Sequence, residues 1–281
     1  MRENWRKQAI IEALKEFDLA GKKELETLLM EHAQVSLQFE LDCKENYERV
    51  GNSRIAGRPD LPPSIEWPCT EDGEAYTFLA QINLSELPFL PADNWPSSGM
   101  LYFFLGLDEP AYDVEHQVFY YDGDLTHLTL ASLPEGTEEI NAEERDFISH
   151  QVTWQPHLSF PDLGEASEML FEEYEDLDTE LSGVSDALGG GLQTWAGETQ
   201  LDAYLCRNGL GDFLFNTYEM PKKLQQEARQ GAQNWQVLFS LSSLREVNMC
   251  WWDAGYLEFL VHVEDLKEGR FANTYLNLAT S

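Results

Sequence analysis

Positive charge is almost absent from the middle of this chain. Residues 59–206 contain 31 acidic residues and a single base, Arg145, so the segment has a formal net charge of -30. The whole chain of 281 residues has a net charge of -33. So dense a negative charge repels a phosphate backbone, which argues against direct nucleic-acid binding. It instead attracts basic proteins or polyvalent cations and speeds their encounter.

Two explanations of this charge stay open. Depletion of lysine with excess Asp and Glu is also typical of proteins from a salty cytoplasm, where charge serves solubility alone. The flanking segments, 1–58 and 207–281, carry net charges of only -1 and -2. This concentration of charge in one segment favours an acidic face that docks a basic protein.

The sequence also lacks paired cysteines, long apolar runs and catalytic motifs. Its four cysteines are scattered without a Cys-x-x-Cys pair, which predicts reduced thiols in a cytoplasmic protein. No stretch approaches the roughly 20 apolar residues of a membrane helix, and no signal peptide is recognisable. Neither a nucleophile motif, a P-loop nor metal-ligand spacing of histidines occurs. We therefore expect no membrane partner, metal or cofactor, and favour a non-enzymatic role.

Among the features that are present, a two-strand pattern occurs twice. Residues 78–88 form an apolar run with a Leu/Ser corner, and a second run rich in Tyr and Phe follows Gly99. The weaker copy comprises residues 237–246 and the apolar run after Gly255. Short β-branched and aromatic runs bounded by Gly, Pro and Asn are typical of strands. Each copy is therefore predicted to be a pair of strands.

The N-terminal residues, 1–34, are predicted to be helices that pack on the body of the protein. Apolar residues recur at four-residue steps between residues 5 and 17. Gly21 interrupts this stripe and a second stripe begins at Leu25, so we expect two short helices. The alternation of apolar and polar residues over 35–41 then predicts a half-buried strand.

Two acidic clusters lie in the segment 108–180. Residues 135–146 are predicted to be a loop leading into a short helix. Residues 165–180 have apolar positions at helical spacing and are predicted to form an amphipathic helix with an acidic outer face. The carboxylates that we expect to bind the basic partner are Glu165, Glu168, Glu172, Glu173, Glu175, Asp176, Asp178 and Glu180.

A triple glycine, residues 189–191, follows the acidic clusters and predicts a flexible joint. A glycine-rich turn can also cradle a phosphate through its backbone N–H groups. No lysine lies near it in the sequence, and its surroundings are strongly negative. The joint is therefore the favoured interpretation.

The residues from Gly57 to Pro68 read Gly-Arg-Pro-Asp-Leu-Pro-Pro-Ser-Ile-Glu-Trp-Pro. Together with the block at 78–87 and the segment 252–259, this run resembles the YwqG-like bacterial domains of unknown function. The resemblance implies an α+β fold, mostly an antiparallel sheet built from two similar halves, with N-terminal helices. It implies no reaction, because the family is defined by sequence.

This resemblance divides the chain into two parts. N-terminal helices over 1–34 precede a duplicated β-rich domain over 35–281, in which the acidic helical segment 108–180 is an insertion between the repeats. The chain departs from the family pattern at Trp252, where the family has glycine, and at Ser240, where the first repeat has glutamine.

Our first hypothesis is a non-enzymatic cytoplasmic protein that docks a basic protein on its acidic surface. Its sharpest version is an immunity or antitoxin protein that covers the cationic active site of a nucleic-acid-cleaving toxin. This version rests on the charge and on the resemblance, because bacterial orphan domains are often partners of secreted toxins.

The alternative hypothesis is a small-molecule-binding or hydrolytic domain with a cleft between the two repeats. Its lining would be Trp67, Gln81, Trp252 and Asp253. Asp253 could act there as a general base, although such an Asp more often caps a turn. Gln81 is similarly more often a buried hydrogen-bonding strut than a ligand contact.

Overall fold

The computed structural model describes residues 1–109, 112–160, 172–181, 186–192 and 198–280. Within these ranges it contains six α-helices and twelve strands. The helices are α1 (Arg2–Glu16), α2 (Lys23–His32), α4 (Glu175–Leu181), α5 (Thr199–Arg207), α6 (Lys222–Ala232) and α7 (Val263–Lys267). The strands are β1 (Gln34–Lys44), β2 (Arg54–Ile55), β3 (Asp60–Leu61), β4 (Thr77–Asn83), β5 (Met100–Leu105), β6 (His116–Tyr121), β7 (Thr129–Leu130), β8 (His150–Ser159), β9 (Ala187–Gly189), β10 (Trp235–Ser242), β11 (Tyr256–His262) and β12 (Tyr275–Ala279).

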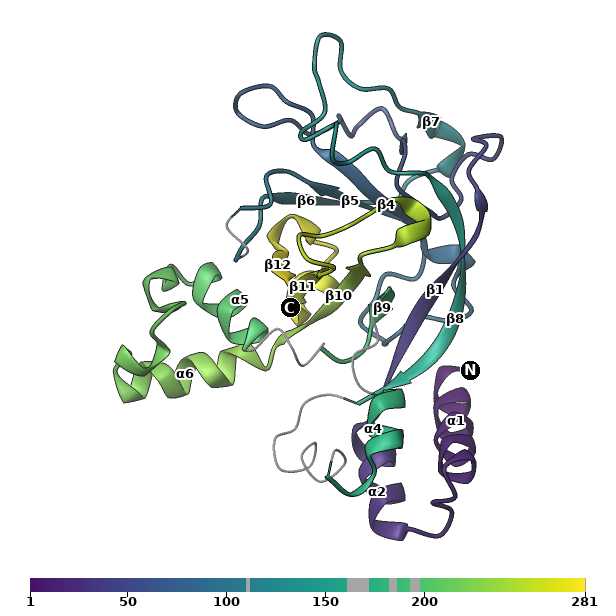
Figure 1. Ribbon diagram of the computed structural model, residues 1–281, viewed down its shortest axis with the longest axis vertical. Coiled ribbons are helices and arrows are strands. Elements are labelled where there is room, and N and C mark those ends of the chain that lie inside the picture. Colours follow the sequence, from purple (N-terminus) through teal and green to yellow (C-terminus); the bar gives the residue numbers. More distant parts are fainter. Residues whose placement is uncertain (110–111, 161–171, 182–185, 193–197, 281) are drawn as a thin grey trace.

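Ten of these strands form one antiparallel sheet that is nearly closed into a barrel (Figure 1). Their order is β12-β11-β10-β9-β1-β8-β2-β4-β5-β6. The two edge strands approach each other where Tyr112 bridges to Asn277 and the Val114 N–H donates to the Leu276 carbonyl at 3.0 Å. The sequence prediction of a mixed fold with a mainly antiparallel sheet is therefore confirmed.

Both predicted strand pairs are antiparallel hairpins, β4 with β5 and β10 with β11. A glycine precedes the second strand of each hairpin. A Cβ atom added to Gly99 would lie 2.6 Å from the backbone oxygen of Tyr121, and one added to Gly255 would lie even closer to that of Ala279. Glycine at these positions therefore lets the neighbouring strand pair closely.

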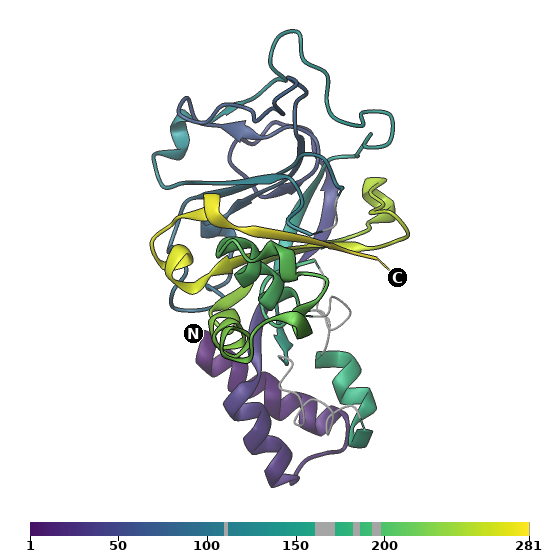
Figure 2. The same ribbon diagram turned by 90° about the vertical axis from the view of Figure 1, so that its left-hand side faces the viewer.

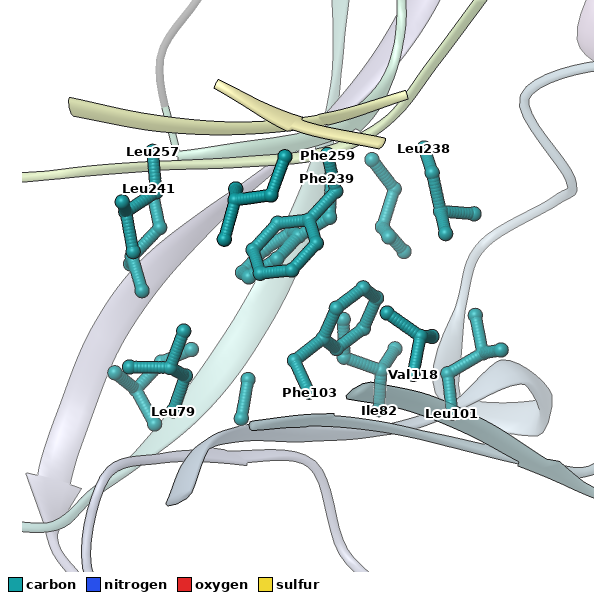
Figure 3. Close-up of a cluster of buried hydrophobic side chains, with 14 of the residues drawn as sticks. Leu79, Ile82, Leu101, Phe103, Val118, Leu238, Phe239, Leu241, Leu257 and Phe259 are labelled. Carbon is teal, nitrogen blue, oxygen red and sulfur yellow. The ribbon is translucent and has the colours of Figure 1, made fainter. Parts of the chain in front are cut away.

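Aromatic side chains from the two hairpins meet inside the barrel (Figure 3). The ring centroid of Phe103 lies 4.7 Å from that of Phe239 and 5.1 Å from that of Phe259. Because successive strand residues point to opposite faces, alternate residues of β5 and β11 reach this core. Aliphatic residues of both hairpins surround the rings, and together they form the largest hydrophobic cluster of the described residues.

Helices α1, α2 and α4 gather beyond one end of β1 and β8, whereas α5 and α6 lie beside the barrel (Figures 1 and 2). Buried Ile10 and Leu14 of α1 pack in one cluster with Leu158 of β8 and Leu177 of α4. The two predicted N-terminal helices are therefore confirmed as elements. Burial of this apolar face, more than intrinsic propensity, stabilises such short helices.

The predicted short helix within 135–146 is wrong, because this segment contains turns in the structure. Its backbone is bonded to Ala75 instead: the Ala75 N–H donates to Glu138 O at 2.8 Å, and the Ile140 N–H donates to Ala75 O at 3.0 Å. These backbone groups are therefore not available to a helix.

Candidate functional site

The proline-rich loop, residues 57–68, is fastened to the sheet by a buried polar network around Arg54. The guanidinium of Arg54 is fully buried and forms ion pairs with Asp60 and with Glu45, the latter at 3.3 Å between Nε and Oε2. It also donates to the Arg58 carbonyl at 3.0 Å. Burial opposes ionisation of Glu45, but hydrogen bonds from Asn52 and the Tyr47 backbone outweigh it, so the pKa of Glu45 is lowered.

Gln81 belongs to this network, so its interpretation as a buried strut is confirmed. Its Nε2 donates to the Asn52 carbonyl at 2.7 Å and to Asp60 Oδ2 at 3.0 Å, and its Oε1 accepts from the Asp60 N–H at 2.6 Å. The Tyr102 hydroxyl donates to the Asp60 carbonyl at 2.7 Å. These contacts hold the proline-rich loop against β4 and β5.

The other residues of the predicted cleft lie elsewhere. Trp67 is buried against Phe104, and its Nε1–H donates to the Tyr76 carbonyl at 2.8 Å. Trp252 and Asp253 lie on the turn between β10 and β11, where Trp252 is 45% exposed. The turn interpretation of Asp253 therefore agrees with its place in the structure, and its role in a cleft stays a prediction.

The predicted docking carboxylates lie on and beside α4, except Glu165 and Glu168, which lie outside the described residues. Glu172, Glu173, Glu175, Asp176 and Glu180 are exposed, and Asp178 is half-buried. The opposite side of α4 buries two leucines against the N-terminal helices. In this way the packing of α4 turns its carboxylates to solvent despite their mutual repulsion.

Arg145 is the single base of residues 59–206, and its side chain points into the protein. It is 6% exposed and donates to Thr77 Oγ1 at 3.1 Å and to the Gly106 carbonyl at 3.0 Å. Its other terminal nitrogen lies 3.3 Å from Asp108. Across the described residues of 59–206, the surface therefore presents carboxylates without an exposed lysine or arginine.

A groove of about 990 Å³ lies between the N-terminal helices and the α5–α6 pair. Its lining includes the triple glycine at 189–191 together with Arg2, Arg6 and Arg229. Sequence reasoning missed this groove, because its arginines come from α1 and α6 and are distant from the glycines along the chain. None of the four residues predicted to line a cleft lies in it.

Burial and the nearby Glu198 carboxylate raise the pKa of Asp202, on α5, to about 7. The pKa of this carboxyl in the unfolded chain is near 3.8. Because the folded-state pKa is the higher one, the carboxyl stabilises the fold fully below about pH 4, and this contribution is lost as the pH rises through 7.

We expect wild-type protein to lose about 2–4 kcal/mol of unfolding free energy between pH 4 and pH 8 through this group. Asp202→Asn keeps a neutral, isosteric side chain at all pH values, so it should match wild type at pH 4 and be more stable at pH 8. Urea unfolding of both proteins across this range measures the difference. A difference that is independent of pH would contradict the prediction.

No helix in the described ranges has the length and apolar character needed to cross a bilayer. Within the same ranges, no three His, Cys, Asp or Glu residues are grouped so that they could hold a metal ion.

Comparison with models of known protein families identifies a match. A family model described as a domain of unknown function, DUF1963, matches residues 53–279. No curated protein matches the chain. The matched range includes both hairpins, the proline-rich loop and Arg54, Asp60 and Gln81 of the buried network. It excludes α1, α2, β1 and the network residues Glu45 and Asn52. Since the match covers well over half of the sequence, the chain belongs to the DUF1963 family of domains of unknown function.

Proposed function

We propose that the protein is a non-enzymatic cytoplasmic binding protein that docks a basic protein on its acidic surface. The observation that carries this proposal is the burial of Arg145, which removes the only positive charge from the described surface of 59–206. A field of one sign steers an oppositely charged partner and raises its association rate. The immunity or antitoxin role is the form of this function that we favour.

Exposed aromatic rings next to Tyr112, a residue of the segment 59–206, support a specific interface. Phe215 and Tyr218 are 74% and 76% exposed. Phe215 packs edge-to-face on Tyr112 at 5.4 Å, and the Tyr218 hydroxyl donates to Asn216 at 2.8 Å. Rigid aromatic anchors commonly dominate the binding energy of interfaces and bind arginine through cation–π contacts. They would add affinity that diffuse charge alone does not supply.

We also infer that the barrel is an internal duplication of the YwqG-like type. The sheet order is symmetric about the central β1–β8 pair. Strands at equal distance from this pair correspond to each other: β9 to β2, β10 to β4, β11 to β5 and β12 to β6. Every neighbouring pair in this sheet is antiparallel. A two-fold axis between the central strands would relate the halves.

Matching contacts support the duplication. A Cβ atom added to Gly57 would lie 2.6 Å from the Ser149 side chain, and one added to Gly190 would lie 2.7 Å from that of Ser36. These glycines follow β2 and β9, which are matching strands, and the two serines lie at the matching ends of β8 and β1. A duplication would explain why a glycine packs closely against a serine at the corresponding place in each half.

The docking proposal predicts that neutralising α4 weakens the binding of a basic protein. Lysozyme serves as the basic probe, with affinity measured by isothermal titration at low and high salt. The α4 variant combines Glu172→Gln, Glu173→Gln, Glu175→Gln, Asp176→Asn and Glu180→Gln. We expect affinity to fall about tenfold at low salt, because several charge pairs are lost together.

A control variant with the same change in net charge tests whether position matters. It neutralises five exposed carboxylates that lie outside residues 59–206 and away from α1, α2 and α4: Glu40, Asp42, Glu48, Glu246 and Glu264. We expect this control to weaken binding only about twofold, through long-range charge that salt screens. Equal losses in the two variants, or binding that is independent of salt, would overturn the proposal.

A further inference from the structure

We propose that the groove between the N-terminal helices and the α5–α6 pair binds a small organic anion. This inference goes beyond the docking of a basic protein, because it concerns a different surface and a ligand of opposite charge. It rests on three features of the described lining: a glycine floor, three arginines and a suitable volume.

The floor of the groove includes Gly189, Gly190 and Gly191 at the end of β9. Gly189 and Gly190 have φ angles of 66° and 90°, which glycine adopts without strain. A Cβ atom on Gly189 would lie 2.7 Å from Pro91, and one on Gly190 would lie 2.7 Å from Ser36. Side chains are therefore excluded at these two positions, so the floor of the groove there is backbone alone.

The arginines of the groove are held in place without being deeply buried. The Arg6 guanidinium donates to the Met30 and Ala33 carbonyls, both at 2.9 Å, and so is fixed at the C-terminus of α2. Arg229 forms an ion pair with Glu198 at 2.7 Å, with both side chains about half exposed. Exposed ion pairs contribute little to stability, so the Arg229 guanidinium can exchange its carboxylate for a ligand at small cost.

Arg2 completes the cationic wall. It lies 2.9 Å from Asp93, whose side chain is 95% exposed. Glu3, Glu31 and Glu198 also line the groove, so its lining is nearly neutral when empty. An anion must therefore compete with protein carboxylates, which predicts moderate affinity and specificity for ligands that offer several oxygen acceptors.

A ligand with carboxylate or phosphate oxygens matches the charge of the arginines in the groove. Each oxyanion can accept hydrogen bonds from more than one guanidinium N–H, which favours it over a neutral ligand.

The volume of the groove, about 990 Å³, suits an organic molecule larger than a single inorganic ion. Trp95 lines the same space and adds an apolar surface. The ligand class that fits is therefore a small molecule that carries one or more oxyanion groups on an organic body.

Isothermal titration of the full-length protein at low ionic strength tests this site. The probes are citrate, adenosine monophosphate and inorganic phosphate, with glycerol as a neutral control. We expect at least one organic probe to bind with one-to-one stoichiometry and more tightly than inorganic phosphate. Failure of all three anions to bind at concentrations up to about 10 mM would overturn the proposal.

The affinities of substituted proteins then show whether the anion binds in this groove. Arg229→Gln and Arg2→Gln should each weaken binding about tenfold, because each removes a guanidinium group from the groove. Arg49→Gln is the matched control, since Arg49 forms a similar exposed ion pair with Glu86, at 2.6 Å, outside the groove. An equal loss of affinity in Arg49→Gln and Arg229→Gln would show non-specific charge binding and contradict the site. Thermal melting of each variant confirms that it is folded.

Discussion

Replacing Arg54 by alanine should lower the free energy of unfolding by about 3–5 kcal/mol. The substitution removes the guanidinium that pairs with Asp60 and Glu45 and leaves both carboxyl groups buried. Removing one partner of a buried ion pair costs more than the pair contributes, because the remaining charge has lost its solvation and its counter-ion. The proline-rich loop should then detach from β4 and β5.

Urea unfolding monitored by tryptophan fluorescence measures this change, since Trp67 lies on the affected loop. Arg49→Ala is the control, because Arg49 forms an exposed ion pair and should cost less than about 1 kcal/mol. Arg54→Ala with a loss as small as that of the control would show that the network does not hold the loop.

Replacing Phe103 by alanine should cost a similar amount, about 3–5 kcal/mol. Phe103 is fully buried and contacts Phe239 and Phe259 of the other hairpin (Figure 3). The substitution loses the transfer free energy of the ring and leaves a cavity that the closed sheet cannot fill by collapsing.

A double-mutant cycle with Phe239→Ala separates the contact between the hairpins from general loss of core. We expect a coupling energy of about 0.5–1.5 kcal/mol, as for other aromatic pairs. Phe215→Ala is the surface control and should change stability by less than about 0.5 kcal/mol, since this ring is mostly exposed. A cost for Phe103→Ala as small as that of Phe215→Ala would contradict the assigned core.

Local periodicity accounts for the part of the fold that could be predicted from the sequence. The four-residue steps before Phe17 predicted α1, the alternation after Val35 predicted β1, and the apolar runs on each side of Gly99 predicted β4 and β5. In each case the pattern and the element occupy the same short stretch, so the signal does not depend on distant residues.

The features that could not be predicted depend on contacts between distant segments. Turns replace the helix expected within residues 135–146. The backbone of Glu138 and Ile140 is hydrogen-bonded to Ala75, about 65 residues earlier, and is therefore not available to a helix. Residues of α1, α6 and the end of β9 line the groove together. No local sequence pattern indicates that these distant segments lie around the same space. Sequence reasoning noted the glycines at 189–191 but found no nearby cation, because nearness along the chain and nearness in space differ here.

The central position of β1 constrains the order in which the barrel can assemble. This early strand pairs with β8 and β9, whose residues are made more than a hundred positions later. During synthesis β1 therefore has two unpaired edges until most of the chain has emerged, and the seam closes only when β12 arrives. Contacts of such high sequence separation slow folding, and open strand edges invite aggregation. The unfinished chain carries the dense negative charge of residues 59–206 during the time between the synthesis of β1 and that of β12. Repulsion between these charges opposes association of one nascent chain with another.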